Sequence, residues 1–417
     1  MKAKGSAALS FIFVTILIDV IGIGIIIPVL PTLIEQLSGE GVSRAAQYAG
    51  YLSFAYAGAQ FLFAPVMGGL SDRFGRRPVL LASLLGLGVD YVFLALAPTL
   101  GWLFVGRVLA GITGASFTTA TAYIADVSPP EKRAQNFGLV GAAFGLGFIV
   151  GPALGGLVAH WGPRVPFVVA AALSLVNFIY GFFVVPESLP EERRRPFEWA
   201  RANAVSSLLR LGQYPQIIGL VASLVLLYLA GSATQSVWTF YTILKFGWGE
   251  SLIGWSLSVV GVGALVVQGG LVRVAIPKLG AKWCILIGIV CYIAGQLLFA
   301  LASQGWMMFA FTGIYAIGGL AGPAMQGAIS GQVPPNEQGE LQGTLTSLIS
   351  ATGIVGPLLM TSLFAYFTKP AAPAYLPGAP FLLGSALALL ALLIAAGPLR
   401  RLPDTVPLPT AGETSAH

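Results

Sequence analysis

The chain has 417 residues, of which 56% are hydrophobic and only 9% are charged, and its formal net charge at pH 7 is +6. An ordinary soluble domain carries about 25% charged residues, so 22 basic and 16 acidic side chains are too few to cover a soluble surface. This composition excludes a soluble enzyme, a disordered chain and a disulfide-rich secreted domain, and it indicates a polytopic helical membrane protein.

Twelve apolar segments are long enough to cross a hydrocarbon core, which requires about 20 helical residues. The first begins like a signal peptide, but its apolar run is longer and no small-residue cleavage site follows, so we expect a retained span. We predict an all-α membrane protein with twelve transmembrane helices. The segments are 8–31, 47–70, 79–98, 101–125, 135–159, 164–185, 214–243, 251–274, 284–302, 306–331, 340–367 and 378–397.

The longest predicted connection, 186–213, divides the chain almost in half. It starts as a charged linker and contains FEWARANAVSSLLRL, which is amphipathic enough to lie on a membrane surface. We therefore predict an N-terminal six-helix bundle over 1–185, a C-terminal six-helix bundle over 214–397 and a cytoplasmic tail over 398–417.

The two halves repeat each other with an offset of 205 residues. Ser-Pro-Pro-Glu at 128–131 is echoed by Val-Pro-Pro-Asn at 333–336, and Gly-Pro at 151–152 by Gly-Pro at 356–357. Two parallel repeats about an axis along the membrane normal can enclose a site at the midplane and rock around it. This repeat is the main indication of a transporter.

The basic residues fall mostly in alternate loops. Seventeen of them lie on one side, four (Arg44, Arg164, Lys245 and Lys369) lie on the other, and Arg107 falls inside the fourth segment. The positive-inside rule then predicts that both termini are cytoplasmic. Basic residues dispersed in this way form no single face for nucleic acid, so no nucleic-acid partner is expected.

The loop after the second segment reads GGLSDRFGRRPVLL at 68–81. Its glycines permit close approach of neighbouring helices, and its arginines form a basic turn at the lipid surface that could simply anchor the chain. The spacing G-x-L-S-D-R-x-G-R-R, however, resembles the signature loop of the major facilitator superfamily. The cytoplasmic gate residues predicted from this loop and from the end of the fourth segment are Gly68, Asp72, Arg73, Gly75, Arg76, Arg77 and Asp126.

Other motifs extend the resemblance over nearly the whole chain. They are LIDVIGIGIIIPVLP at 17–31, LFVGRVLAGITGA at 103–115, and GAAFGLGFIVGPALGG at 141–156, which resembles the antiporter motif through Gly151 and Pro152. The chain is most similar to twelve-helix drug:proton antiporters of the tetracycline-efflux type. The resemblance implies two pseudo-symmetric six-helix bundles in a bacterial plasma membrane. It also implies an expected monomer, no cofactor, and exchange of a drug for protons as the coupling ion.

The chain departs from the tetracycline exporters at two positions. They carry a histidine in the eighth span and an aspartate in the ninth, where this chain has Ala264 and Tyr292, while the acids of the first and third spans are kept as Asp19 and Asp90. We therefore expect proton coupling with a preferred substrate other than a metal–tetracycline chelate.

The proton-coupling candidates are Asp19, Asp90 and Arg107. Asp19 lies about 16 Å deep by helical rise, where a charged carboxylate costs about 3 kcal/mol and the protonated form is favoured. Arg107 keeps its proton, so we expect it to pair with Asp19 or with backbone carbonyls of the first helix. The alternative for each acid is a protonated or paired structural role.

Four polar or aromatic residues are predicted to line a substrate cavity, although each could instead be interhelical packing. With few fixed charges in the spans, we expect an amphipathic substrate. No metal-ligand cluster, phosphate loop or nucleophile–base pair is apparent, so a membrane-embedded enzyme is disfavoured. A proton-coupled exporter is the prediction, and a solute:proton symporter is the alternative. The predicted cavity residues are Gln235, Trp238, Gln268 and Gln326.

Overall fold

A computed structural model describes residues 2–114, 116–128, 133–194, 215–334 and 338–400, and over these residues the regular structure is entirely helical. The first half contains long helices joined by short turns. They are α1 (Lys2–Ile26), α2 (Leu30–Ser38), α3 (Val42–Phe74), α4 (Arg76–Leu96), α5 (Leu100–Thr113), α6 (Ser116–Val127), α7 (Arg133–Val158) and α8 (Val165–Val184).

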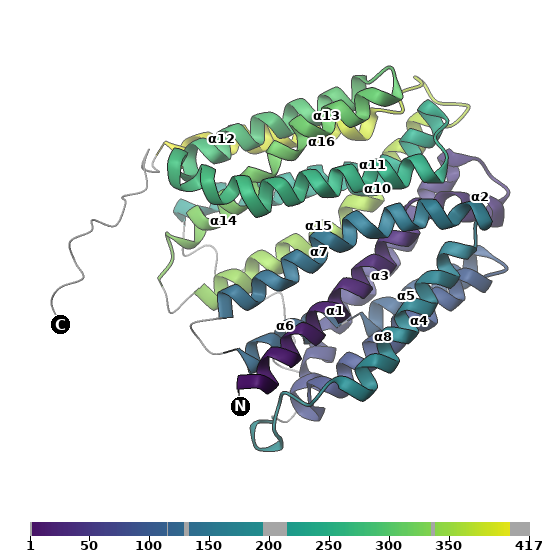
Figure 1. Cartoon of the computed structure of the whole chain (residues 1–417). Helices are drawn as coiled ribbons and strands as arrows, with labels where there is room; N and C mark the ends of the chain where they lie inside the picture. Colours follow the sequence, from purple (N-terminus) through teal and green to yellow (C-terminus); the bar gives the residue numbers. More distant parts are fainter. Residues whose placement is uncertain (1, 115, 129–132, 195–214, 335–337, 401–417) are drawn as a thin grey trace.

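The second half follows the same plan. Its helices are α10 (Pro215–Phe246), α11 (Glu250–Val266), α12 (Val272–Leu301), α13 (Gly305–Ile317), α14 (Ala321–Ser330), α15 (Gln338–Thr368) and α16 (Ala379–Leu399). In Figure 1 the purple-to-teal helices of the first half lie below the green-to-yellow helices of the second. The amphipathic stretch 197–211 and the tail beyond residue 400 lie outside the described residues.

The predicted membrane segments coincide with these helices. Ten apolar stretches of the described chain are long enough to span a membrane, and one of them, Glu250–Leu301, is 52 residues long and holds two predicted segments. Helix α3 is absent from the ten although it has 33 residues, because its sequence is less apolar. The fourth and tenth segments are each broken into two helices, α5 with α6 and α13 with α14.

Two glycines mark the internal repeat in the backbone. Gly75, between α3 and α4, has φ 104° and ψ 160°, and Gly280, inside α12, has φ 80° and ψ 160°. Both φ values lie in the region that favours glycine. The two positions are 205 residues apart, the offset found in the sequence motifs, and each ends one membrane crossing and starts the next.

Three apolar cores show where the halves join. One contains residues of both halves, among them Ile25, Leu52, Trp238 and Phe364, at the end away from the basic turn. The other two belong to one half each, at the end of the basic turn. Helix α7 packs on α11 and α3 packs on α15 across the join. The halves are therefore fastened together at one end and separately packed at the other.

Candidate functional site

A cavity of about 870 Å³ lies between the halves, within the 300–1,000 Å³ range of drug-sized sites. Its walls come from the first six helices and from α15. Ile26, Leu52 and Leu94 line its apolar end, and all three belong to the core that joins the halves. Gly68, beside the basic turn, lines the other end. The cavity therefore extends from the closed end of the molecule toward the end where the halves separate.

Polar side chains line the rest of the cavity. Most are hydroxyl-bearing residues of α3, α6 and α15, and no acidic side chain is among the described lining residues. The polar lining residues are Ser53, Tyr56, Gln60, Arg107, Thr118, Thr121, Thr346, Ser347 and Ser350.

Arg107 on the cavity wall is paired with Asp90. Nε of Arg107 lies 3.3 Å from Oδ1 of Asp90, and Nη2 contacts Oδ2. The Asp90 side chain is completely buried, whereas that of Arg107 is 20% exposed. The expectation that Arg107 pairs with Asp19 or with carbonyls of the first helix is therefore wrong. Helices α4 and α5 form an antiparallel pair joined by 97–99, and the two residues lie at similar distances from that turn, so they meet at the same depth.

Asp19 is held in a different polar group. It is 6% exposed, and the Asn177 amide of α8 donates to its Oδ1 at 3.3 Å and to the carbonyl of Thr15 at 3.0 Å. Asp19 is not among the cavity-lining residues. Sequence reasoning missed Asn177, a single amide in the apolar sixth segment. Its isolation there was the available signal, because a buried amide needs polar partners.

The four predicted cavity residues lie elsewhere. Trp238 is 1% exposed and packs in the core that joins the halves, with its indole N–H donating to a serine hydroxyl of α11 at 3.0 Å. Gln326 donates to the Tyr228 hydroxyl at 3.4 Å, an interhelical bond. Gln235 and Gln268 are exposed, and neither is among the residues that line the cavity. The second half contributes hydroxyls of α15 instead, because the packing of α15 on α3 turns that face inward.

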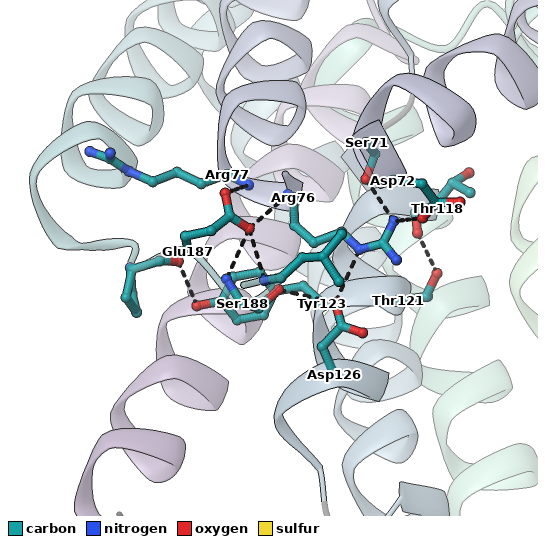
Figure 2. Close-up of polar contacts among 12 residues, drawn as sticks. Ser71, Asp72, Arg76, Arg77, Thr118, Thr121, Tyr123, Asp126, Glu187 and Ser188 are labelled. Atoms are coloured by element: carbon teal, nitrogen blue, oxygen red, sulfur yellow. Dashed lines mark hydrogen bonds and ion pairs between the residues drawn. The ribbon is translucent and has the colours of Figure 1, made fainter. Parts of the chain in front are cut away.

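Arg76 is the centre of a polar network at the basic turn (Figure 2). Its guanidinium contacts Asp72 at 2.5 Å, Asp126 at 3.0 Å and the Ser71 hydroxyl at 2.9 Å. The network joins the end of α3, the start of α4 and the end of α6. Of the gate residues predicted at 68–81, Asp72 and Arg76 therefore lie together with Asp126.

Glu187, which sequence reasoning took as part of a charged linker, caps α4 in the same region. Its carboxylate accepts backbone N–H bonds from Arg76 at 2.8 Å and Arg77 at 3.2 Å, and from the two residues that follow Glu187 at 3.0 Å. A carboxylate at a helix N-terminus is stabilising. A Cβ at Gly75 would collide with this carboxylate, so the glycine is needed for space as well as for its positive φ.

The remaining two arginines of the turn make peripheral contacts. The Arg73 guanidinium lies 5.1 Å from the Phe74 ring centre, and Nη2 of Arg77 donates to the Phe182 carbonyl at 2.6 Å. Neither arginine reaches Asp126 in this arrangement of the described residues.

Gly151 and Pro152 lie where three helices cross. A Cβ at Gly151 would stand 2.8 Å from the Cα of Gly24 in α1, and the Pro152 carbonyl approaches Gly254 of α11. The motif therefore permits close packing of α7 against both halves.

The two positions expected to differ from tetracycline exporters, Ala264 and Tyr292, carry no carboxylate or imidazole. The Tyr292 hydroxyl lies 3.2 Å from that of Tyr315, and Ala264 has no donor group. No group of three metal-binding side chains occurs among the residues that the structure describes.

Comparison with known proteins places this geometry in context. The family model of the Major Facilitator Superfamily matches residues 12–277 and 220–415. The class C tetracycline resistance protein of Escherichia coli is 41% identical over 87% of this chain and 91% of its own length. The class H protein of Pasteurella multocida is 37% identical over 92% and 94%.

Solved structures agree in fold. A bacterial homologue of the human lysosomal transporter Spinster, inward-facing and unoccupied, has a TM-score of 0.71 at 19% identity and covers 96% of this chain and 97% of its own. The nucleoside transporter NupG has a TM-score of 0.74 at 12% identity and covers 93% and 99%.

Proposed function

This chain belongs to the major facilitator superfamily, and from that premise we propose that it is a proton-coupled antiporter that exports an amphipathic molecule by alternating access. It is a multi-pass membrane transporter and not an enzyme. The observation that carries the proposal is the cavity between the halves, which is closed at one end and reaches the basic turn at the other.

Direct bonds between the halves support a gate at the closed end. The Thr32 hydroxyl of α2 donates to Glu250 of α11 at 2.8 Å, and the Ser43 hydroxyl of α3 donates to the carbonyl of Thr368 in α15 at 3.1 Å. If the basic loops face the cytoplasm, as the positive-inside rule favours, this gate is the external one. The present arrangement is then the inward-open state, and transport requires these bonds to break.

Asp19 is the proposed proton carrier. It is buried near the midplane, where carrying a charge costs about 3 kcal/mol, and its bond from Asn177 links α1 to α8. The Asp90–Arg107 pair is the proposed second element, because protonation of Asp90 would weaken an ion pair at the cavity wall. Both elements connect proton binding to helix contacts of the first half.

The substrate is proposed to be drug-sized and amphipathic. The cavity volume fits such a molecule, and the tetracycline resistance relatives are named for a drug of this size. Ala264 has no donor group, and the Tyr292 hydroxyl lies 3.2 Å from the Tyr315 hydroxyl. Because neither position carries a carboxylate or an imidazole, we propose a substrate that needs no chelated metal, with tetracycline itself included in any panel of test compounds.

We further propose that the N-terminal bundle spans 1–185 and the C-terminal bundle 214–397, joined by the linker 186–213. Both termini are proposed to be cytoplasmic, in a bacterial plasma membrane, and the unit of function a monomer. Each bundle has its own apolar core at the basic end, which supports two bodies that rock against each other.

Proteoliposomes with an internal pH dye test the proposal. Addition of a transported drug outside should drive protons out of the vesicle and raise the internal pH, and Asp19→Asn should abolish this response. Acidification of the interior would instead identify a symporter. Drug flux without any pH change would identify a facilitator.

A further inference from the structure

We propose that the cavity recognises an amphipathic monoanion through its oxyanion, such as a carboxylate, enolate or phenolate, and discriminates against lipophilic cations. That the bound anion is the transported substrate rests on the proposed function. The binding preference itself rests only on the residues that line the cavity.

The Asp90–Arg107 pair is an oriented dipole with its positive end at the cavity. The Asp90 side chain has 0% exposure and lies behind Arg107, whose side chain is 20% exposed and lines the cavity. Nε and Nη2 of Arg107 contact Asp90. The third guanidinium nitrogen, Nη1, is left to donate to a ligand. A ligand oxygen therefore meets the guanidinium before it meets the carboxylate.

Tyr56 supplies a second donor beside this arginine. Its ring centre lies 5.5 Å from the Arg107 guanidinium carbon. The Gln60 amide nitrogen is fixed by a 2.9 Å bond to the Gly114 carbonyl, and it donates to the Tyr56 hydroxyl at 3.3 Å. Because that hydroxyl already accepts a bond, its own hydrogen is free to be donated to a ligand. Gln60 thus acts as a positioning residue for the tyrosine.

The other lining residues include no charged group that would bind a cation as Arg107 binds an anion. No carboxylate is among the described lining residues, and the lining hydroxyls of α6 and α15 serve donors and acceptors alike. Arg107 is the charged side chain among the described lining residues, and it attracts an anion and repels a cation, so the arginine decides the preference. Because Asp90 partly neutralises the charge of Arg107, the cavity favours a ligand with one negative charge over a ligand with two.

The apolar end of the cavity accepts the rest of the molecule. Ile26, Leu52 and Leu94 line it. If the apolar body of a ligand occupies this end, the oxyanion at its edge lies beside Arg107 and Tyr56. The substrate class is therefore an apolar body with one conjugated oxygen anion at its edge.

Three matched fluorescent probes test this preference in lipid nanodiscs without any gradient. Anthracene carboxylate, anthracene methanol and anthracenylmethylammonium share one apolar body and differ in charge. After subtraction of binding to empty nanodiscs, the carboxylate should bind about tenfold more tightly than the ammonium, equivalent to ~1.4 kcal/mol. Equal or tighter binding of the ammonium would overturn the proposal.

Variants assign the preference to the proposed donors. Asp90→Asn with Arg107→Gln replaces the ion pair by two neutral amides, so no buried charge is left alone, and the preference should fall to about twofold or less. Tyr56→Phe should weaken only the carboxylate, by about threefold. Gln268→Ala, outside the cavity, should change nothing. A tenfold preference that survives in a folded double variant would refute the role of Arg107.

The outcome is separable from that of the proposed function. If the carboxylate probe shows no preference over the ammonium probe but drugs still drive proton movement, only this inference is refuted. A clear preference in nanodiscs with no proton movement in proteoliposomes removes the antiport proposal and leaves the binding site standing.

Discussion

Gly156→Ala should open the closed end of the molecule. A Cβ at Gly156 of α7 would stand 2.6 Å from the Glu250 carbonyl oxygen and 2.9 Å from the Cα of Ser251 in α11. Both neighbours are backbone atoms, so no side-chain rotation relieves the overlap. Overpacking of this kind costs about 1–3 kcal/mol. If the opposite state separates these helices, the equilibrium shifts toward it by about 5–150-fold.

Spin labels across the closed end measure this shift. Gln36→Cys and Ser303→Cys lie in opposite halves at that end, with Cys284 and Cys291 replaced by alanine. The label-to-label distance distribution should gain a longer population in Gly156→Ala. Gly141→Ala is the control, because a Cβ at this position of the same helix meets no atom within 4 Å. Unchanged distances in Gly156→Ala, or an equal change in Gly141→Ala, would refute the reasoning.

Further substitutions test the polar groups one at a time. Asp19→Asn should abolish drug-driven proton movement yet keep drug binding, since asparagine mimics the protonated acid; wild-type transport against a gradient would remove the carrier role. Arg107→Ala should lower the free energy of unfolding by about 3–5 kcal/mol, because Asp90 is left buried without its partner, and thermal melts in detergent would show no such loss if the pair is unimportant. Glu187→Gln should weaken the α4 cap by about 1 kcal/mol, seen as faster hydrogen exchange at the start of α4 and at no other helix end. Asp72→Asn should reduce turnover more than drug binding by favouring the arrangement described here, and equal losses of both would count against a gating role.

Sequence reasoning was confirmed for the fold and the family because both depend on patterns that survive any side-chain placement. Apolar segments of membrane-spanning length and the 205-residue repeat fix the class of architecture. The motif at 68–81 was informative for the family, because its residues are neighbours in the chain. Its contacts with Asp126 and Glu187 come from distant parts of the sequence, and the bond to Glu187 was not predicted.

The cavity was not predicted correctly, because its lining depends on how each helix is rotated and how the halves dock. Trp238 and Gln326 are used for packing and interhelical bonding, while the hydroxyls of α15 face the cavity. The Asp90–Arg107 pair, in contrast, could have been found. Both residues are similarly distant from the turn between the third and fourth segments, and an antiparallel pair of helices brings such positions to one depth.

Cysteine labelling at the cavity tests the central claim of alternating access most directly. A single cysteine at the lining position Ser347, in a chain without Cys284 and Cys291, is treated with a membrane-impermeant maleimide in inside-out and right-side-out vesicles. We expect faster labelling from the cytoplasmic face than from the outside at rest, and Gly156→Ala should raise the rate of labelling from the outside. In the protein that keeps Gly156, equal labelling from both faces of the membrane, or no labelling from either face, would contradict alternating access.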